Sequence, residues 1–546
     1  MKNRLLFIIL LFAWVNFFIS CSSNSNGKPS PFIQKDTIPD TQLPPDLSLR
    51  GSFSSQSKIK FDSSVLYSFF KQYPKYKSFE RIVYQFYRNR KYAFAWFDEN
   101  GLIEHAGNLY NKINQVEDEG LHKQILYQER FHALMEGDVP EISLDQPNTE
   151  VELMLTLQYF CYAQSVWTGI SDAVLKDLKW DLPRKRLSYD AILDSLLQGP
   201  SVEFMQNEPV YIQYRLLKSW LKKLRSLEQA GGWTEIKYPK GKHYKLKDSS
   251  LVLIKIRERL FLTEDLMNNN HQAVFDESLL QGVKKFQQRH GYHESGVITD
   301  KLIDEMNVSV TNRIKQIIIN MERCRWLPIR LSGNYFVINI PEFRFHAFEN
   351  DRHVWSMKVV VGKQLNQTAV FNGKLKYVVF SPYWNIPPGI MRKEIVPALR
   401  RDKLYLRRNN MEWHGRSIRQ KPGPQNALGL VKFLFPNSHN IYMHDTPSKT
   451  LFEQDDRAFS HGCIRIEQPK MLAQYVLRDQ PEWTEIRIDS AMHDGKELFV
   501  AIKNPIPVYI AYFTTWVDAA GKLNFRKDIY KRDHKLGEAI FLQTNK

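Results

Sequence analysis

Apolar residues change their spacing once along this chain, near Asn334. Before that point they recur three and four positions apart, which predicts amphipathic helices; an example is the run Phe79, Ile82, Val83, Phe86 and Tyr87. After it, segments such as YFVINI, HAFEND and WSMKVVVG alternate or are β-branched between Gly, Asn and Pro turn signals, which predicts strands. With 546 residues, the chain exceeds what one hydrophobic core usually serves. We therefore predict a multidomain α+β protein, with a helical part followed by a mostly-β domain.

The helical part divides into three stretches. Residues 61–248 predict a helical scaffold domain, and residues 249–308 form a compact unit with three short helical patterns. Residues 309–331 are helical again, so we expect them to pack back on the first stretch and make the unit at 249–308 an insertion. The string VKKFQQRHGYHESGVITDKLIDEMN in this unit resembles the peptidoglycan-binding module of wall hydrolases and synthases. A plain three-helix spacer is the alternative.

The mostly-β domain is expected at residues 334–502, with a C-terminal hairpin and tail at 503–546. Residues 386–433 interrupt its strands with a partly helical segment that carries 11 Lys and Arg against 3 Asp and Glu, a net charge of +8. A loop of this length inside a compact domain is usually functional. Further expected strands are Asn440–His444, Ser460–Arg465, Thr484–Ile488 and Glu497–Ile502.

The one long apolar run of the sequence, residues 5–19, follows Lys2 and Arg4. Fifteen residues reach ~22 Å as a helix, short of a ~30 Å hydrocarbon core, so we predict a signal peptide over residues 1–21 and no membrane span. The run ends in Phe-Ile-Ser-Cys, which resembles the lipobox of bacterial lipoproteins and implies lipidation of Cys21. An ordinary cleaved signal with an incidental Cys is the alternative.

Export sets the expected surroundings of the protein. Residues 22–60 are rich in Pro, Ser and Asn, which predicts a flexible tether. We expect a periplasmic protein that is lipid-anchored to the envelope, and Ser22 and Ser23 favour the outer membrane. The chain has 76 Lys and Arg against 59 Asp and Glu, a net charge of +17. In an exported protein this charge favours envelope polymers over nucleic acid as partners.

The four cysteines exclude two classes of site. Their positions, 21, 161, 324 and 463, provide neither a disulfide framework nor a CxxC zinc motif. Cys161 and Cys324 both lie in helical segments, and the sequence leaves open whether they form a pair. No metal or organic cofactor is expected.

The chemically informative stretch holds His444 and then Ser-His-Gly-Cys at 460–463. A thiol acts as a nucleophile in its thiolate form, which requires a base nearby. His444 can deprotonate Cys463 if their strands lie side by side, and a carbonyl at Asp445 can hold the imidazole tautomer. Gly462 permits close backbone approach, and the amides of residues 461–463 are candidates for an oxyanion hole. Arg465 is expected on the strand face of Cys463, where it can bind a carboxylate or brace the site.

Together these residues resemble the catalytic domain of L,D-transpeptidases of the YkuD type. The segments WNIPPGI, RQKPGPQNALG, YMHDTPSK and RAFSHGCIRI carry the likeness, and fifteen residues separate His444 from Ser460, as the family motif allows. The plan resembles the large scaffold-bearing Gram-negative subgroup, which implies a β-sandwich catalytic domain and a capping subdomain at 386–433. Many members have Asn where this chain has Arg465.

The resemblance also implies residue roles. Cys463 corresponds to the nucleophile and His444 to its base, while His461 and Gly462 match motif residues of the catalytic site. Contacts to substrate or to the residues around it are expected at Tyr442, Asp445, Ser460 and Arg465.

The implied reaction is acyl transfer between peptidoglycan stem peptides, through a thioester on Cys463, to give 3→3 crosslinks. Penem-type β-lactams are expected to acylate the same thiol. Water or a lipoprotein Lys as acceptor would instead make the site an L,D-carboxypeptidase or an anchoring enzyme. The remaining alternatives are a sortase-like transpeptidase, a papain-like wall peptidase (in which Cys normally precedes His) and a non-enzymatic wall-binding scaffold lipoprotein.

Overall fold

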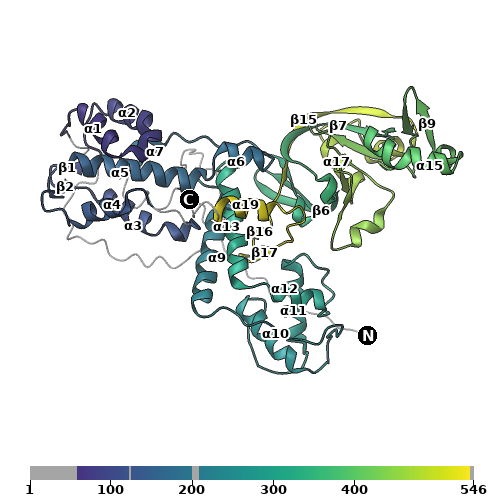
Figure 1. The fold of residues 1–546 in the computed structure, drawn as a ribbon. Coiled ribbons are helices and arrows are strands. Elements are labelled where there is room, and N and C mark those ends of the chain that lie inside the picture. Colours follow the sequence, from purple (N-terminus) through teal and green to yellow (C-terminus); the bar gives the residue numbers. More distant parts are fainter. Residues whose placement is uncertain (1–57, 122–124, 199–207, 542–546) are drawn as a thin grey trace, which may run out of the picture.

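The computed structural model describes residues 58–121, 125–198 and 208–541. The predicted signal peptide, Cys21 and nearly all of the predicted tether lie outside these residues. Figure 1 shows a helical body at one end, a β-rich body at the other and a small helical body below their junction. The prediction of a multidomain α+β fold is confirmed. None of the helices in the described ranges is long and apolar enough to cross a membrane.

The helical body is built around α5 (Thr149–Tyr162), which is buried on nearly every side. Asn148 caps this helix by accepting hydrogen bonds from the amides of Glu150 and Val151. A helix that is apolar all round needs neighbours on every side. The other helices and strands of this body are α1 (Ser64–Gln72), α2 (Glu80–Asn89), β1 (Phe97–Asp98), β2 (Gly101–Leu102), α3 (Glu104–Asn114), α4 (Gln128–Glu136), α6 (Asp172–Asp177), β3 (Trp180–Asp181) and α7 (Tyr189–Gln198).

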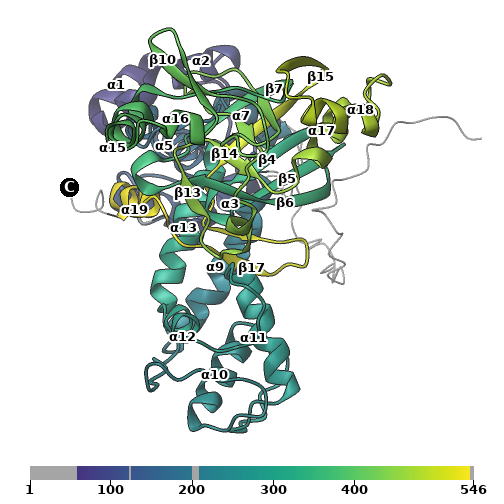
Figure 2. The ribbon, with the colours of Figure 1, turned by 90° about the vertical axis from the view of Figure 1, so that its right-hand side faces the viewer.

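Two long helices connect the helical body to a three-helix module. They are α9 (Ile212–Gln229), which leads to the module, and α13 (Val310–Trp326), which returns beside it. Figure 2 shows the module projecting from the rest of the molecule on these two helices. The module has an apolar core of its own, and its position in the chain makes it an insertion between α9 and α13. Its helices are α10 (Leu251–Leu262), α11 (Glu277–Arg289) and α12 (Asp300–Met306).

The β-rich body contains one mixed sheet. Its strands are β4 (Tyr335–Asn339), β5 (Arg344–Glu349), β6 (Arg352–Gly362), β7 (Val370–Phe380), β11 (Val431–Leu434), β12 (Met443–His444), β13 (Ala458–Ser460), β14 (Ile464–Ile466) and β15 (Leu498–Ala511). The order is β11-β12-β14-β6-β5-β4-β15-β7, and β11 also pairs with β7, so the sheet closes on itself around an apolar core. β3 of the helical body adds to β7 as a parallel neighbour.

A small cap, residues 384–420, lies between β7 and β11 in the chain, at the end of the β-rich body farthest from the helical body (Figure 1). Ile386, Ile395 and Ile418 form its own buried core. The expected capping segment at 386–433 is too long, because its last three residues belong to β11. The elements of the cap are β8 (Trp384–Asn385), α14 (Pro388–Ile390), α15 (Val396–Arg401), α16 (Tyr405–Arg408), β9 (Met411–His414) and β10 (Ser417–Gln420).

The strand that we predicted at Thr484–Ile488 is wrong, because Glu485–His493 is helix α18. The hydroxyl of Thr484 accepts a hydrogen bond from a first-turn amide and so caps this helix. The alternating pattern was misleading because Ile486 is 82% exposed, so it does not mark a buried strand face. The helix packs against α17 (Pro469–Leu477).

The C-terminal boundary also needs correction. β15 continues to Ala511 and pairs with β4, so the sheet extends past the expected boundary at 502. The hairpin expected after it consists of β16 (Thr515–Val517) and β17 (Leu523–Phe525). A final helix, α19 (Arg532–Phe541), packs against α13 and was not anticipated from the sequence.

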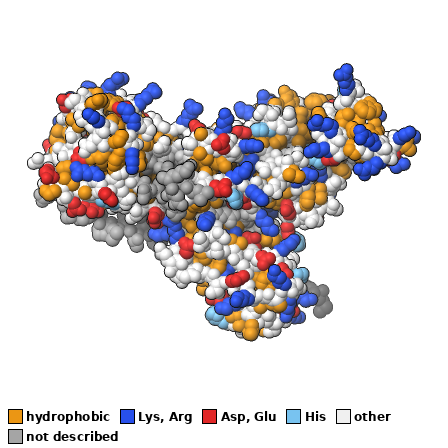
Figure 3. Space-filling model, in the orientation of Figure 1, with side chains coloured by type: hydrophobic (Ala, Val, Ile, Leu, Met, Phe, Trp, Pro, Cys, Tyr) orange, Lys and Arg blue, Asp and Glu red, His pale blue; other side chains and the backbone are white. Residues whose placement is uncertain are grey.

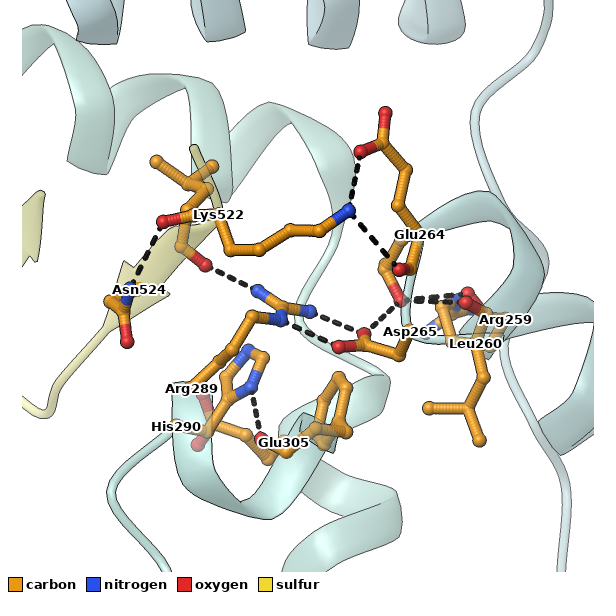
Figure 4. Close-up of polar contacts among 12 residues, drawn as sticks. Arg259, Leu260, Glu264, Asp265, Arg289, His290, Glu305, Lys522 and Asn524 are labelled. Carbon is orange, nitrogen blue, oxygen red and sulfur yellow. Dashed lines mark hydrogen bonds and ion pairs between the residues drawn. The ribbon is translucent and has the colours of Figure 1, made fainter. Parts of the chain in front are cut away.

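Polar contacts fasten the module to the β16–β17 hairpin (Figure 4). Arg289, the last residue of α11, donates from Nε to Oδ1 of Asp265 at 2.6 Å and from its guanidinium to the Leu523 carbonyl. Lys522 of the hairpin lies 3.0 Å from Glu264 of the module. The Arg289 and Asp265 side chains are both almost fully buried, so water screens their pairing little. The module is therefore held in a fixed place beside the hairpin.

Candidate active site

His444 lies in β12, and Cys463 directly precedes β14, the strand that pairs with β12. β12 pairs with β14 in parallel, with Met443 opposite Ile464 and His444 opposite Arg465. Met443 and Ile464 are fully buried in the apolar core. Because side chains alternate along a strand, His444 and Arg465 point away from that core. His444 and Cys463, nineteen positions apart in the sequence, thus lie on neighbouring segments.

His444 is held as a neutral imidazole. Its Nδ1 atom lies 2.5 Å from the backbone carbonyl oxygen of Asp445. A carbonyl can only accept a hydrogen bond, so Nδ1 carries the proton and Nε2 keeps a lone pair. Burial and the positive charge of Arg465 lower the pKa of His444 to about 4, against a smaller opposing effect of Asp445. At neutral pH the ring is therefore able to accept a proton.

The Asp445 side chain holds the chain around His444 in place. Its carboxylate accepts hydrogen bonds from the amides of Leu430 and Thr446, at 2.9 and 2.6 Å, and pairs with Lys449 at 2.6 Å. Gly429 leaves room for it, since a Cβ there would lie 2.3 Å from Oδ2. The side chain of Asp445 therefore supports the loop, and its carbonyl fixes the His444 tautomer; a contact of Asp445 with substrate stays a prediction.

Cys463 carries a protonated thiol at rest. Burial raises the pKa of this thiol, whereas hydrogen bonds from Tyr442 and the charge of Arg465 lower it by less. The thiol donates to the carbonyl of Asn440 at 3.9 Å, and no hydrogen bond joins it to His444 among the described residues. Proton transfer to His444 therefore requires the thiol to turn away from Asn440.

Tyr442 lies close to both candidate catalytic groups. Its ring centroid is 5.8 Å from that of His444, and its backbone and side chain both hydrogen-bond to Cys463. Burial and the neighbouring Cys463 raise the pKa of Tyr442, so its hydroxyl stays protonated and can donate. This position suits a group that supports the sulfur as it ionises.

The turn that carries Cys463 is fixed by Ser460 and Gly462. The Ser460 hydroxyl accepts a hydrogen bond from the Gly462 amide at 3.1 Å and donates to the Cys463 carbonyl at 2.5 Å. Gly462 has φ +119°, a conformation that favours glycine, and its carbonyl accepts from the Thr368 hydroxyl at 2.9 Å. Of the two roles expected for Ser460, the structure favours the supporting one, because the side chain is buried in the turn.

These contacts reduce the number of backbone amides that can form an oxyanion hole. The Gly462 amide is already used by Ser460, so its expected role as an oxyanion donor is corrected. The amides of His461 and Cys463 have no acceptor within the described part of the chain. These two unused amides are therefore the remaining candidates for donors to a developing oxyanion.

His461 is turned toward the cap. Its Nε2 atom lies 2.9 Å from Oε1 of Glu394, which belongs to the π-helical turn Met391–Ile395. Both side chains are partly exposed. The contact joins the catalytic turn to the cap and leaves His444 as the candidate base for Cys463.

Arg465 contributes positive charge on the strand face of His444. Its Nε atom is buried without a hydrogen-bond acceptor in the described residues. Lys and Arg side chains also gather at the outer end of the cap (Figure 3). An anionic substrate approaching this face therefore meets positive charge from both sides.

Three supporting residues were not identified from the sequence: Thr368, Glu394 and Asn440. No local signal could have found Thr368, which lies 94 positions before the glycine that it contacts. Cys161 and Cys324, whose pairing was open, do not form a disulfide with each other, and Cys463 is not in a disulfide either. No cluster of three or more His, Cys, Asp or Glu side chains suited to a metal occurs in the described residues.

Comparisons with known proteins agree with this geometry. Residues 333–499 match the model of the L,D-transpeptidase catalytic domain, YkuD, and residues 81–221 match the model of a Scaffold domain. A Haemophilus influenzae protein named "Putative L,D-transpeptidase" is 29% identical over 250 residues, which cover 42% of this chain and 50% of that protein. This chain therefore spans about half the length of the curated relative that it matches.

Solved structures with local similarity include an L,D-transpeptidase from Mycobacterium smegmatis, at 13% identity and a TM-score of 0.19, covering 33% of this chain and 59% of that one. An L,D-transpeptidase from Stackebrandtia nassauensis has 12% identity and a TM-score of 0.23, covering 50% and 97%. L,D-transpeptidase 3 from Mycobacterium tuberculosis, solved with a faropenem-derived adduct, has 15% identity and a TM-score of 0.18, covering 33% and 60%. The likeness to the L,D-transpeptidase catalytic domain comes from the family model matched by residues 333–499.

Proposed function

Because residues 333–499 form an L,D-transpeptidase catalytic domain of the YkuD family and follow a Scaffold domain, we propose that this protein forms 3→3 crosslinks between peptidoglycan stem peptides through a thioester on Cys463. One observation carries the proposal. A buried, neutral His444 with its Nδ1 proton fixed by a carbonyl lies in β12, and Cys463 directly precedes β14, the strand that pairs with β12.

The first step is acylation of Cys463. The thiol turns from Asn440 and gives its proton to His444 Nε2, and the sulfur attacks the carbonyl of the third residue of a donor tetrapeptide. The tetrahedral oxyanion is stabilised by the free amides of His461 and Cys463. When the amide bond breaks, the amine of the terminal D-Ala takes the proton from His444 and leaves, and a thioester remains on Cys463.

The second step transfers the acyl group. An amine on an acceptor stem attacks the thioester, and His444 Nε2 accepts the proton that this amine loses. The new amide bond forms as the sulfur leaves, and the sulfur recovers a proton from His444. With water as acceptor, the same site would release a shortened stem as an L,D-carboxypeptidase; with a lipoprotein Lys, it would anchor that protein to the wall.

Positive charge explains how the site selects its donor. Arg465 lies beside Cys463, and the cap above the catalytic turn is rich in Lys and Arg. Stem peptides carry free carboxylates, which such groups bind by charge-assisted hydrogen bonds. The proposed place of action is the periplasm, with a lipid at Cys21 as the anchor to the envelope.

Intact-mass spectrometry with a penem tests the proposal directly. An L,D-transpeptidase of Mycobacterium tuberculosis has been solved with a faropenem-derived adduct, and another one in complex with imipenem. We expect one penem adduct on this protein, located at Cys463, and muropeptide analysis should show 3→3 crosslinks. Cys463→Ala should abolish both, whereas the matched variant Cys161→Ala should retain both. Crosslinking by Cys463→Ala would overturn the proposed mechanism.

A further inference from the structure

A cavity of about 1090 Å³ lies away from the candidate active site, where four parts of the molecule meet. Its lining comes from the closed sheet, the β16–β17 hairpin, the end of α11 in the module and the helical body. Neither His444 nor Cys463 is among the lining residues. Its size is at the upper limit of ordinary ligand sites, roughly 300–1,000 Å³.

The floor of this cavity is the outer face of the sheet. Val337 lies opposite His346, Asn339 opposite Arg344, and His346 opposite Ser356, and all five residues line the cavity. The residues between them point to the other face, where they are buried in the apolar core: Ile338, Phe345, Ala347 and Met357. A polar sheet face that would otherwise meet bulk water is thus roofed by the neighbouring parts of the chain.

The walls are fixed in place. Tyr292 of the module and Trp516 of the hairpin both line the cavity, and the Arg289 contacts in Figure 4 hold these two parts together. On another side, the amide of His293 donates to Oδ1 of Asp455 at 2.8 Å and joins the module to the β-rich body. The cavity is therefore built into the domain arrangement.

Three guanidinium groups line the cavity without a carboxylate partner in the described part of the chain: Arg344, Arg457 and Arg526. Arg344 donates to a serine hydroxyl at 3.2 Å, and Arg457 and Arg526 donate to backbone carbonyls at 2.5 and 2.7 Å. The Nε atoms of Arg457 and Arg526 are buried with no acceptor. Each of these two guanidinium groups thus keeps a donor that the described protein atoms do not satisfy, which leaves its charge incompletely compensated.

The three positive charges act on one another. Burial and the charge of Arg344 lower the pKa of Arg457 to about 10. Burial also lowers the pKa of Arg526 to about 10; Glu342 opposes this effect, and Arg344 and Arg457 add to it. With pKa values of about 10, Arg457 and Arg526 remain charged at neutral pH, and an anion beside them would relieve their repulsion.

The acidic residues of the lining form no ion pair with Arg344, Arg457 or Arg526 within the described part of the chain. Glu342 lies 3.1 Å from His346, and although burial would raise its pKa, His346, Arg526 and Arg344 lower it to about 2. Glu342 lies close to Arg344 and Arg526, whereas Asp455, Glu467 and Asp456 raise the pKa of Arg457 and Glu305 raises that of Arg526, in each case by less than burial lowers it. Of the other acidic residues of the lining, Glu294 is exposed, and the remaining three have partners of their own: Glu453 with Lys358, Asp455 with the His293 amide, and Asp518 with amides of its own turn.

We propose that this cavity binds a carboxylate-bearing muropeptide at a second site, distinct from the one where crosslinks form. The free carboxylates of the ligand pair with Arg344, Arg457 and Arg526, and its sugar or peptide backbone lies against Tyr292 and Trp516. The identity of the ligand rests on the proposed function, whereas the charge and shape of the site do not.

The second site lies close to the turn that carries Cys463, and this position gives the site a function. Arg457 directly precedes β13, and β13 leads into the turn that carries Cys463. The Arg457 carbonyl also accepts a hydrogen bond from Val361 of β6 at 2.9 Å, so the wall of the cavity and the catalytic turn share one frame. A wall strand held here is retained by the enzyme while a stem peptide enters or leaves the active site.

Calorimetric titration of the full-length Cys463→Ala protein with a soluble disaccharide tetrapeptide tests the proposal, because no reaction follows binding. Arg344→Glu should weaken one binding component by at least about tenfold, since it replaces charge-assisted hydrogen bonds by repulsion. The matched control is Arg352→Glu, on the same β5–β6 hairpin but exposed and outside the cavity, which should bind like the parent. Hydrogen exchange should show ligand-dependent protection of amides in residues 516–524.

The proposal would be overturned by equal affinities of the Arg344→Glu and Arg352→Glu proteins, by equally tight binding of a muropeptide with amidated carboxylates, or by absence of protection in the hairpin. The gentler variant Arg344→Gln guards against a folding defect, and it should lie between the parent and Arg344→Glu. Failure of the proposed function would show separately, as a wild-type protein that forms no penem adduct, because the titration does not depend on catalysis.

Discussion

The active-site strands and the module junction each bury a histidine in nearly the same way. Nδ1 of His444 donates to the Asp445 carbonyl at 2.5 Å, and Nδ1 of His290 donates to the Phe286 carbonyl at 2.8 Å. Burial lowers the pKa of His444 to about 4 and that of His290 well below its usual 6.5. Both rings are therefore neutral, with one fixed tautomer.

Their neighbours differ. The ring of His290 stacks on Phe286 and Phe525, with centroids 3.8 and 5.6 Å away, so it fills space between the module and the hairpin. His444 instead lies in the strand that pairs with β14, which Cys463 directly precedes. A buried imidazole with a fixed proton is thus an ordinary structural solution, and a nucleophile beside it makes it a base.

Replacing each imidazole, at His444 and at His290, tests this comparison most directly. His444→Gln should lower the rate of 3→3 crosslinking by about 10³-fold, because general-base catalysis contributes about 10²–10⁴-fold. His290→Gln, in the soluble protein, should change the rate by no more than about twofold. Chromatography of muropeptide products measures both. Near-normal crosslinking by His444→Gln would contradict its role as the base.

The pH dependence of kcat/KM tests whether His444 is as deeply buried in the active enzyme as the comparison requires. With a pKa of about 4, His444 stays unprotonated down to about pH 5, so kcat/KM should fall by less than about twofold between pH 7 and pH 5. A histidine with the usual pKa of ~6.5 would lose about thirtyfold over this range. Initial rates in overlapping buffers measure the acid limb. A midpoint near 6.5 would show that the ring is not buried in the active enzyme.

The free energy of unfolding should change mainly when His290 is replaced. His290→Ala should lower the free energy of unfolding by about 2 kcal/mol, because the ring is sandwiched between two aromatic side chains. The pKa of His290 is depressed in the folded state, so its stabilising effect is complete above pH ~6.5 and is lost as the pH falls. His290→Phe should therefore lose less stability than the parent between pH 7 and pH 5. Denaturant titrations at the two pH values decide this.

The turn around Cys463 has no counterpart at His290. The variant Ser460→Ala tests how much this turn contributes to kcat. Loss of the two hydrogen bonds of this hydroxyl, worth about 1 kcal/mol each, should lower kcat by roughly tenfold or more while leaving penem acylation detectable. Ser219→Ala, on the exposed face of α9, is the matched control. Unchanged kcat in Ser460→Ala would show that Gly462 and Thr368 hold the turn without it.

The smallest effect is expected at the contact between the catalytic turn and the cap. Glu394 and His461 are both partly exposed, and pairs of this kind contribute about 0–1 kcal/mol. Glu394→Gln should therefore raise KM by no more than about fivefold and leave kcat nearly unchanged. A large loss of kcat would mean that the cap positions His461 for chemistry.

Much of the fold followed from periodicity, because buried helices and strands impose their repeats on the sequence. The sequence predicted strands at both His444 and Cys463 but left open whether these strands are neighbours, which the pairing of Met443 with Ile464 now answers. The segment at 484–488 misled because alternation over five residues also occurs on an exposed helix, where the Thr484 cap decides the outcome.

Contacts between distant segments could not be predicted. Thr368 and Glu394 meet the catalytic turn only because the sheet and the cap fold around it, and neither carries a local motif. The basic cavity is invisible in the sequence for the same reason. Arg344, Arg457 and Arg526 are scattered over 183 positions and converge only when the hairpin, the loop before β13 and the sheet are assembled.

The strand β3 has a practical consequence. It belongs by sequence to the helical body, yet it hydrogen-bonds along β7 at Val370 and Phe371, and Trp180 and Trp326 fill part of the core of the β-rich body. Cutting the chain at residue 333 to isolate the enzyme would expose an unpaired edge of β7 and leave part of the core of the β-rich body unfilled. Unpaired edges of this kind recruit strands from other molecules. A truncated enzyme is therefore expected to aggregate, and inhibitor screening should use the longer chain.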